Sequence, residues 1–198
     1  PGTALRLTFR LFRVELSAMV SLLVRSMRPR QWTKNGLVFA ALIFSRSLFS
    51  PGDVLRSLAA FLAFCLLSGA VYIINDLVDR ENDQRHPQKR LRPVASGRLK
   101  RPTAAVTASL FAVTALVGGF WLDVRFGVII LAYFLMQLAY SFRLKRVVVL
   151  DVMLVAAGFA FRAVAGTFVV HVRISPWLFI CTILLALFLA IAKRRHEL

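Results

Sequence analysis

Aspartate residues recur at a regular spacing in one short stretch of this chain, although acidic residues are rare overall. Only nine Asp and Glu residues occur among 198, and Asp76, Asp79 and Asp83 lie three and four positions apart. On a helix that turns about 100° per residue, this spacing places the three carboxylates on one face. Stacked carboxylates repel one another unless a cation neutralises them, and oxygen ligands of this kind suit Mg²⁺. We therefore predict that the three aspartates bind a magnesium ion.

Basic side chains follow the aspartates, and His86-Pro87 is expected to end the helix that carries the carboxylates. Guanidinium and ammonium groups bind phosphate oxygens. Together with Mg²⁺ they predict a diphosphate site, and the alternative is a solvated loop held by ion pairs. The basic candidates in this segment are Arg85, Lys89, Arg90 and Arg92.

Three further basic segments are expected on the same side of the protein as the aspartates. Their side chains are candidates for substrate binding, and the alternative role is to anchor helix ends at the membrane surface. The candidates are Lys34 in RPRQWTKN, Tyr140, Ser141 and Lys145 in YSFRLKR, and Lys193 and Arg194 in KRRHEL.

Two charged residues lie inside one hydrophobic stretch, where ionised side chains are costly and usually face a cavity or a partner. Asp151 lies near the expected cytoplasmic end, where it can orient Lys145 or a substrate hydroxyl. Arg162 lies eleven residues further along the chain. Both a structural salt bridge and a snorkelling position remain open for this arginine.

The composition indicates the elements that must position these residues. The chain is 59% hydrophobic and 18% charged, with a mean hydropathy of +0.71, whereas soluble domains carry about 25% charged residues. This excludes an ordinary soluble enzyme, and the continuous apolar runs favour membrane-spanning helices over a barrel. We expect an all-α, polytopic transmembrane bundle with about six spans. The expected spans are 36–50, 54–75, 103–122, 126–142, 148–170 and 176–192.

The positive charge alternates along the chain with these spans. The net charge is +17, and 21 of the 26 Lys and Arg residues fall in four segments, 1–35, 76–102, 142–147 and 193–198. The positive-inside rule places these segments in the cytoplasm. Because the cations punctuate hydrophobic spans rather than form one soluble basic face, nucleic acid is not an expected partner. The predicted site therefore faces the cytoplasm from a multi-pass protein of the plasma membrane.

The N-terminal segment, residues 1–27, has apolar and basic positions on different faces of a helix. Such a helix lies in the headgroup region of a membrane, and the alternative is a targeting presequence. We expect two regions, an amphipathic interfacial segment at 1–27 and a transmembrane domain at 28–198.

Asn75 and the three aspartates match the motif N-D-x-x-D-x-x-x-D, and on this basis the chain resembles the UbiA superfamily of intramembrane prenyltransferases. The stretch from Tyr140 to Arg146 resembles the tyrosine–lysine loop of that family, with Lys145 as its lysine. The resemblance covers about residues 27–198. It implies a helix bundle around a central cavity, with Mg²⁺-bound diphosphate beneath a cytoplasmic cap loop. It also implies about nine spans, of which the last three are missing from this sequence.

The sequence departs from the usual family pattern at one motif, and this departure bears on which substrates are expected. KRRHEL stands where a second aspartate-rich motif is typical, and with RPRQWTKN, HPQKRLRPVASG and YSFRLKR it is similar to the branch of decaprenyl-phosphate phosphoribosyltransferases. This resemblance implies a Mg²⁺-dependent transfer of 5-phosphoribose from phosphoribosyl pyrophosphate to a polyprenyl phosphate. Pyrophosphate is released, the isoprenoid tail lies in an apolar groove open to membrane lipid, and the product supplies cell-wall arabinan.

Two other functions remain open at this point. The same scaffold can transfer a polyprenyl group from its diphosphate to an aromatic acceptor such as 4-hydroxybenzoate, although the missing second aspartate motif counts against it. The other is a non-catalytic membrane protein or transporter with a loop of ion pairs.

Overall fold

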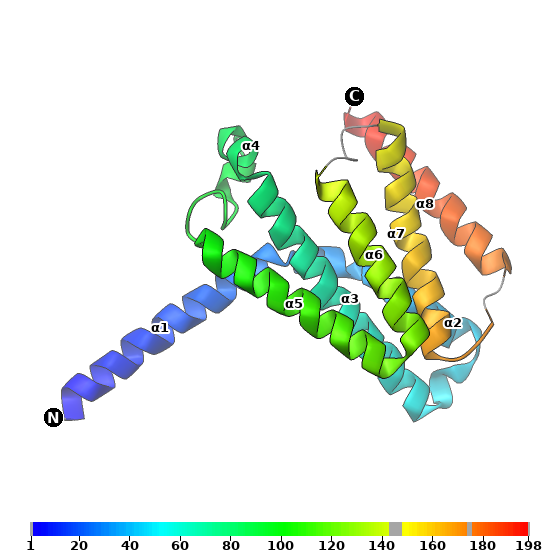
Figure 1. Ribbon diagram of the computed structural model, residues 1–198, viewed down its shortest axis with the longest axis horizontal. Coiled ribbons are helices and arrows are strands. Elements are labelled where there is room, and N and C mark those ends of the chain that lie inside the picture. The colour runs from blue at the N-terminus through cyan, green and yellow to red at the C-terminus, as the bar shows by residue number, and fades with distance from the viewer. Residues whose placement is uncertain (1, 143–147, 174–175, 198) are drawn as a thin grey trace.

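The computed structural model describes residues 2–142, 148–173 and 176–197, and all regular structure within these residues is helical. Four helices are long and apolar enough to cross a membrane, namely α3 (Pro51–Val78), α5 (Arg101–Leu122), α6 (Val124–Phe142) and α7 (Val148–Val169). They pack side by side in one bundle (Figure 1), and α8 (Pro176–Glu197) lies against α7. The expected all-α, multi-pass bundle is confirmed.

The longest helix, α3, contacts α5, α6 and α7 and forms the centre of the bundle. Its start is defined by a capping residue, because the Ser50 side chain accepts a hydrogen bond from the backbone N–H of Asp53 at 3.4 Å. Pro51 occupies the first turn, where a missing N–H costs nothing. The helix then runs to Val78, so it carries Asn75 and Asp76 at its last turn.

The connection between α5 and α6 is a single residue, Asp123. Its carboxylate accepts hydrogen bonds from the backbone N–H groups of Arg125 and Phe126 at 2.8 and 3.0 Å, which caps α6. The two helices approach closely here, because a Cβ on Gly127 would lie 2.9 Å from the Cα of Phe120. A tight helical hairpin results.

The expected first span, 36–50, is wrong as a continuous helix. The chain forms a 3₁₀ helix η1 (Pro29–Phe39), a short α2 (Ala40–Phe44) and a 3₁₀ turn η2 (Ser47–Phe49), and Arg46 between them has φ 60°. The η1 segment packs between α3 and α7. The helix α8 includes the whole of the expected span 176–192.

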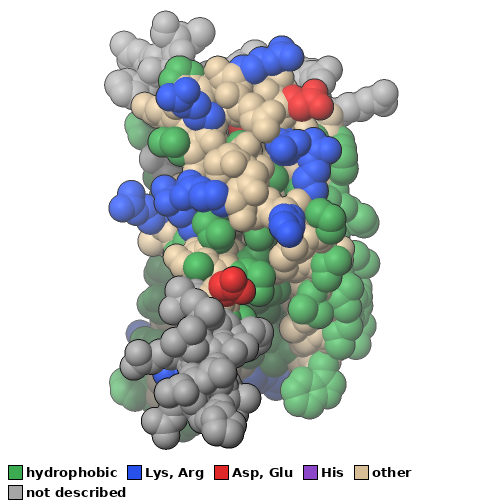
Figure 2. All heavy atoms as spheres, turned by 90° about the vertical axis from the view of Figure 1, so that its left-hand side faces the viewer, with side chains coloured by type: hydrophobic (Ala, Val, Ile, Leu, Met, Phe, Trp, Pro, Cys, Tyr) green, Lys and Arg blue, Asp and Glu red, His purple; other side chains and the backbone are tan. Residues whose placement is uncertain are grey.

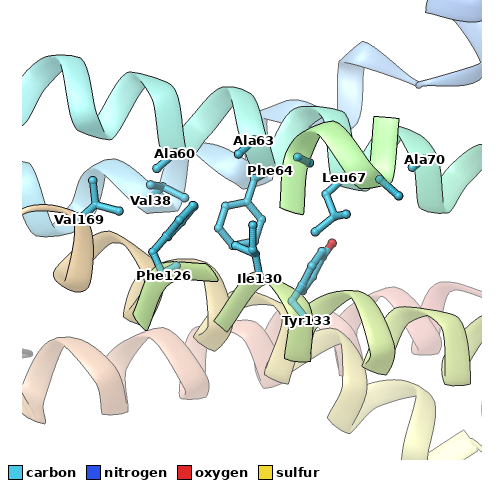
Figure 3. Packing of buried hydrophobic residues seen from close by; sticks show 13 residues of the cluster. Val38, Ala60, Ala63, Phe64, Leu67, Ala70, Phe126, Ile130, Tyr133 and Val169 are labelled. Atoms are coloured by element: carbon cyan, nitrogen blue, oxygen red, sulfur yellow. The ribbon is translucent and has the colours of Figure 1, made fainter. Parts of the chain in front are cut away.

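A cluster of buried apolar side chains holds the helices together (Figure 3). Phe64 of α3 forms edge-to-face contacts with Phe126 and Tyr133 of α6, with ring centroids 6.0 and 5.4 Å apart. Figure 3 shows Tyr133 reaching from α6 towards Leu67 of α3. The aromatic ring of Tyr133 therefore belongs to the core, whereas its hydroxyl group is available to the interior between α3, α6 and α7.

Two elements lie outside the bundle. The N-terminal helix α1 (Gly2–Ser26) extends away from it (Figure 1), so the expected helix forms, and its position at a membrane interface stays a prediction. After α3, the short helix α4 (Arg80–Arg85) and the 3₁₀ turn η3 (Lys89–Leu91) form a cap at one end. Gln84 donates a hydrogen bond to the carbonyl of Ala95 at 3.1 Å and holds this cap together.

Candidate functional site

Two of the three predicted aspartates meet at the cap end of α3. Asp76 and Asp83 are only 2% and 3% exposed, and one nitrogen, Nη1 of Arg92, lies 3.2 Å from Asp76 Oδ1 and 2.6 Å from Asp83 Oδ2. The Arg28 guanidinium also pairs with Asp76 Oδ1. A buried carboxylate is retained only when it is neutralised or hydrogen bonded. Two arginines therefore supply the charge that Asp76 and Asp83 require.

The local backbone explains how residues seven positions apart come together. The helix α3 ends at Val78, but the hydrogen-bonding pattern continues, because Asp79 N–H donates to the carbonyl of Asn75 at 2.9 Å and Asp83 N–H donates to that of Asp79 at 2.8 Å. Asp76 and Asp83 thus share one side, as the spacing predicts. The helix ends before His86-Pro87, also as predicted.

The three carboxylates do not form a ready-made metal cluster among the described residues. The donor set nevertheless fits a hard divalent cation, because Asp76 and Asp83 offer carboxylate oxygens and a cationic nitrogen already lies between them. The sequence predicts that Arg92 binds phosphate, whereas the structure shows its guanidinium between the carboxylates of Asp76 and Asp83. A magnesium ion held by Asp76, Asp79 and Asp83 stays a prediction.

A cavity of about 320 Å³ begins beside these ion pairs. Its wall is contributed by η1, α3, α6 and α7, and Arg28 belongs both to this wall and to the ion pair with Asp76. The Arg28 guanidinium also lies 4.9 Å from the centre of the Tyr72 ring, a cation–π contact that helps to hold it in place. We call the end of the cavity beside Arg28 and Asp76 the mouth. The carboxylate pair and the cavity therefore form one continuous site.

Four predicted substrate-binding residues line this cavity. Lys34 comes from η1, Asn75 from α3, and Tyr140 and Ser141 from the end of α6. Asp151 accepts a hydrogen bond from the Tyr140 hydroxyl at 2.7 Å, so it positions a residue of the cavity wall. The structure thus brings together side chains from three distant segments that the sequence could only assign to the same side of the membrane.

The other predicted candidates lie elsewhere. Arg85, Lys89 and Arg90 are exposed on the cap and are not among the cavity-lining residues. Lys145 lies outside the described residues. Lys193 and Arg194 belong to the last turns of α8, and their side chains are outside the described part of the structure.

The cavity also contains a residue whose place sequence reasoning left open. Arg162 of α7 is 7% exposed and lines the cavity. It donates hydrogen bonds to Asn35 Oδ1 at 2.8 Å, to the Gly158 carbonyl at 2.6 Å and to the Tyr133 hydroxyl at 2.9 Å. No carboxylate pairs with it within the described residues, so neither a salt bridge nor snorkelling describes it. The signal in the sequence is its position deep in an apolar stretch.

Basic side chains are concentrated towards one end of the molecular surface. Figure 2 shows Lys and Arg side chains gathered over the upper part of the face that carries α1, with hydrophobic side chains along the flank and the lower part. The cap formed around α4 lies towards the upper end in Figure 1. The basic end and the apolar flank are typical of a multi-pass membrane protein.

Comparison with known proteins shows which enzymes this chain resembles in sequence. The chain is 40% identical over 184 residues to the decaprenyl-phosphate phosphoribosyltransferase of Mycolicibacterium smegmatis, which covers 91% of this chain and 58% of that protein. The enzyme of the same name from Mycobacterium tuberculosis is 35% identical over 184 residues, with 91% and 61% covered. The chain therefore spans about three fifths of the length of these relatives.

A solved structure has the same fold. A UbiA homologue from Archaeoglobus fulgidus, bound to DMAPP and Mg²⁺, superposes with a TM-score of 0.72 at 20% identity, over 83% of this chain and 60% of that one. The sequence model of the UbiA prenyltransferase family matches residues 36–196 of this chain. This match includes the helices α3, α5, α6 and α7 and every wall of the cavity apart from the residues before Gly36. The chain belongs to the UbiA prenyltransferase family.

Proposed function

We propose that this chain carries the cytoplasmic-side active site of a phosphoribosyltransferase that acts on a polyprenyl phosphate. The ribose C1–oxygen bond of phosphoribosyl pyrophosphate breaks, and its electron pair leaves on pyrophosphate. A phosphate oxygen of the polyprenyl phosphate forms the new bond to C1. This nucleophile is anionic at neutral pH, so the reaction needs no strong general base.

The observation that carries the proposal is the charge of the cavity wall. Arg28, Lys34 and Arg162 line the cavity, and its lining within the described residues includes no Asp or Glu. A cavity with this balance accepts a ligand rich in phosphate, and both substrates of the proposed reaction carry phosphate groups. The alternative pair, a polyprenyl diphosphate and an aromatic acid such as 4-hydroxybenzoate, brings fewer phosphate groups. The names of the relatives from M. smegmatis and M. tuberculosis support the same substrates.

The residues of the mouth have distinct tasks in this reaction. Arg28 and Arg92 lie against Asp76, where they can stabilise the charge that develops on the departing pyrophosphate. Lys34, Asn75, Tyr140 and Ser141 line the adjoining wall and can orient the donor.

Asp76, Asp79 and Asp83 would hold Mg²⁺, which supplies Lewis-acid stabilisation of diphosphate oxygens when bound. The exposed Arg85, Lys89 and Arg90 of the cap, with Lys145, Lys193 and Arg194, would attract the anionic substrates. A UbiA homologue of the same fold binds Mg²⁺, which supports this assignment.

The proposed location follows from the same arrangement. The basic end lies in the cytoplasm by the positive-inside rule, and α1 lies along the plasma-membrane surface. The water-soluble donor then reaches the mouth from the cytoplasm, while the polyprenyl chain stays in the membrane. In cells that build an arabinan-containing wall, the product would serve as the precursor of arabinose donors.

The proposal is tested with radiolabelled donors and membranes that contain the full-length protein. We expect Mg²⁺-dependent transfer of label from phosphoribosyl pyrophosphate to a polyprenyl phosphate, and none from a polyprenyl diphosphate to 4-hydroxybenzoate. Asp76→Ala and Asp79→Ala should each reduce the rate at least a hundredfold, whereas Glu81→Gln, an exposed neighbour, should retain it. Transfer in the opposite sense, or wild-type rates in both alanine variants, would refute the proposal.

A further inference from the structure

The inner end of the cavity, the end away from Asp76, contains a buried cation without an acidic partner among the described residues. This cation is Arg162, which is 7% exposed and forms no ion pair within the described part of the chain. Its guanidinium lies 5.0 Å from the centre of the Tyr133 ring and 5.8 Å from that of the Phe159 ring. A buried charge without a counter-ion is expensive for a fold. Aromatic faces and neutral hydrogen-bond acceptors compensate this cost only in part. The charge therefore calls for a negative group from outside the chain.

The hydrogen bonds around Arg162 point in the same direction. The Tyr133 hydroxyl accepts one hydrogen bond from Arg162 and another from the Gln137 side-chain amide at 3.1 Å. Its own O–H has no acceptor among the described residues, although Tyr133 is only 1% exposed. Arg162 uses three of its five N–H groups on the protein. The inner end thus has more donors than acceptors, which favours an anionic ligand.

This inner end is separate from the mouth. Arg162 binds Asn35, and Asn35 donates a hydrogen bond to Ser68 of α3 at 3.2 Å. Along α3, Ser68 lies seven residues before Asn75, and at about 1.5 Å per residue the two positions are about 10 Å apart. Both residues line the cavity. A ligand at Arg162 is therefore distinct from a diphosphate held near Asp76.

We infer that Arg162 and Tyr133 form a second phosphate subsite, which binds a phosphate monoester at the inner end of the cavity. This inference rests on the proposed function for its two sources of such a group, the 5-phosphate of the donor and the phosphate of the polyprenyl acceptor. In either case Arg162 contacts the oxygens of the monoester, and the Tyr133 hydroxyl donates to one of them. The subsite distinguishes substrates with a second phosphate from simple prenyl diphosphates.

Calorimetric titration of the purified full-length protein in detergent tests the subsite. Saturating pyrophosphate first occupies the mouth, and inorganic phosphate, ribose 5-phosphate and farnesyl phosphate are then titrated separately. We expect Arg162→Gln to weaken inorganic phosphate binding at least tenfold, since the cation of a buried charge-assisted contact is lost. Arg125→Gln, an exposed arginine at the far end of α6, should bind phosphate like the wild type. Pyrophosphate binding should remain unchanged in both variants.

The ester whose binding depends on Arg162 identifies the source. A loss confined to ribose 5-phosphate assigns the subsite to the donor, and a loss confined to farnesyl phosphate assigns it to the acceptor. Tyr133→Phe keeps the aromatic ring and leaves the charge of Arg162 in place, so it decides the matter if Arg162→Gln fails to fold. We expect this variant to weaken phosphate binding about three- to tenfold, because one hydrogen-bond donor is lost.

Phosphate binding of wild-type strength in a folded Arg162→Gln, or in Tyr133→Phe where the first variant does not fold, would overturn the inference. The proposed function fails in a different way. If labelled phosphoribosyl pyrophosphate is not a donor but phosphate binding still depends on Arg162, the subsite stands and only its substrates change.

Discussion

Arg162 of α7 donates a hydrogen bond from Nε to Asn35 Oδ1 at 2.8 Å, across 127 positions of the chain. Asn35 is 1% exposed and belongs to η1, the segment that replaces the expected first span. Its amide nitrogen donates to Ser68 of α3. One asparagine therefore joins three elements, and it holds the guanidinium at the cavity wall.

Asn35→Ala should lower the free energy of unfolding by about 1–3 kcal/mol, because it leaves a buried guanidinium N–H without an acceptor. Thermal unfolding of the detergent-solubilised protein measures the effect. Thr33→Ala is the matched control, since Thr33 is exposed on the same element and bonds only to a nearby backbone carbonyl. Equal melting temperatures for the two variants would show that the Asn35–Arg162 bond contributes nothing to the fold.

Gly166→Ala should be strongly destabilising, because an added Cβ would collide with the backbone carbonyl of Val38 in η1, and a backbone cannot rotate away. A cost of about 1–3 kcal/mol is expected for such overpacking. Gly118→Ala is the control, since a Cβ there meets nothing within 4 Å and alanine favours a helix. Unfolding temperatures of the two variants should move in opposite directions, and a stable Gly166→Ala protein would contradict the close packing of η1 on α7.

Arg92→Ala should destabilise the cap end by about 1–2 kcal/mol. The loss leaves Asp83, 3% exposed, without the cation 2.6 Å from it, and the value is modest because the Arg92 side chain is itself 25% exposed. A double-mutant cycle with Asp83→Ala measures the coupling. Arg90→Ala, which changes an exposed arginine of the same turn, should leave stability unchanged. Additive effects of Arg92→Ala and Asp83→Ala would contradict the ion pair.

The sequence predicts the helical bundle and the shared side of Asp76 and Asp83, because both depend on local periodicity. Hydrophobic runs indicate the helices, and spacings of three and four indicate one face. The expected helix at 36–50 fails for a non-local reason. Asn35, directly before this segment, is used in hydrogen bonds to α3 and α7, which no window of the sequence reveals.

The site is predictable only in part for the same reason. Lys34, Asn75, Tyr140 and Ser141 can be assigned to one end of the bundle from the charge pattern, and the structure places them on the cavity wall. Arg92 and Arg162 show the limit. Each is one arginine among many, and the partner of each, a carboxylate pair for Arg92 and a neutral network for Arg162, depends on contacts between segments distant in sequence.

Competition between Mg²⁺ and Arg92 gives a last prediction. Nη1 of Arg92 lies between Asp76 and Asp83, so a divalent cation that binds both carboxylates must displace this nitrogen. Arg92→Ala should therefore raise the affinity for Mg²⁺, measured as thermal stabilisation during a Mg²⁺ titration without substrate. Asp83→Asn should lower that affinity, because a neutral amide is a weaker ligand than a carboxylate. Glu81→Gln, exposed beside them, should leave it unchanged. If Arg92→Ala instead weakens Mg²⁺ binding while the protein stays folded, the arginine does not compete with the ion, and the metal lies elsewhere than between these two carboxylates.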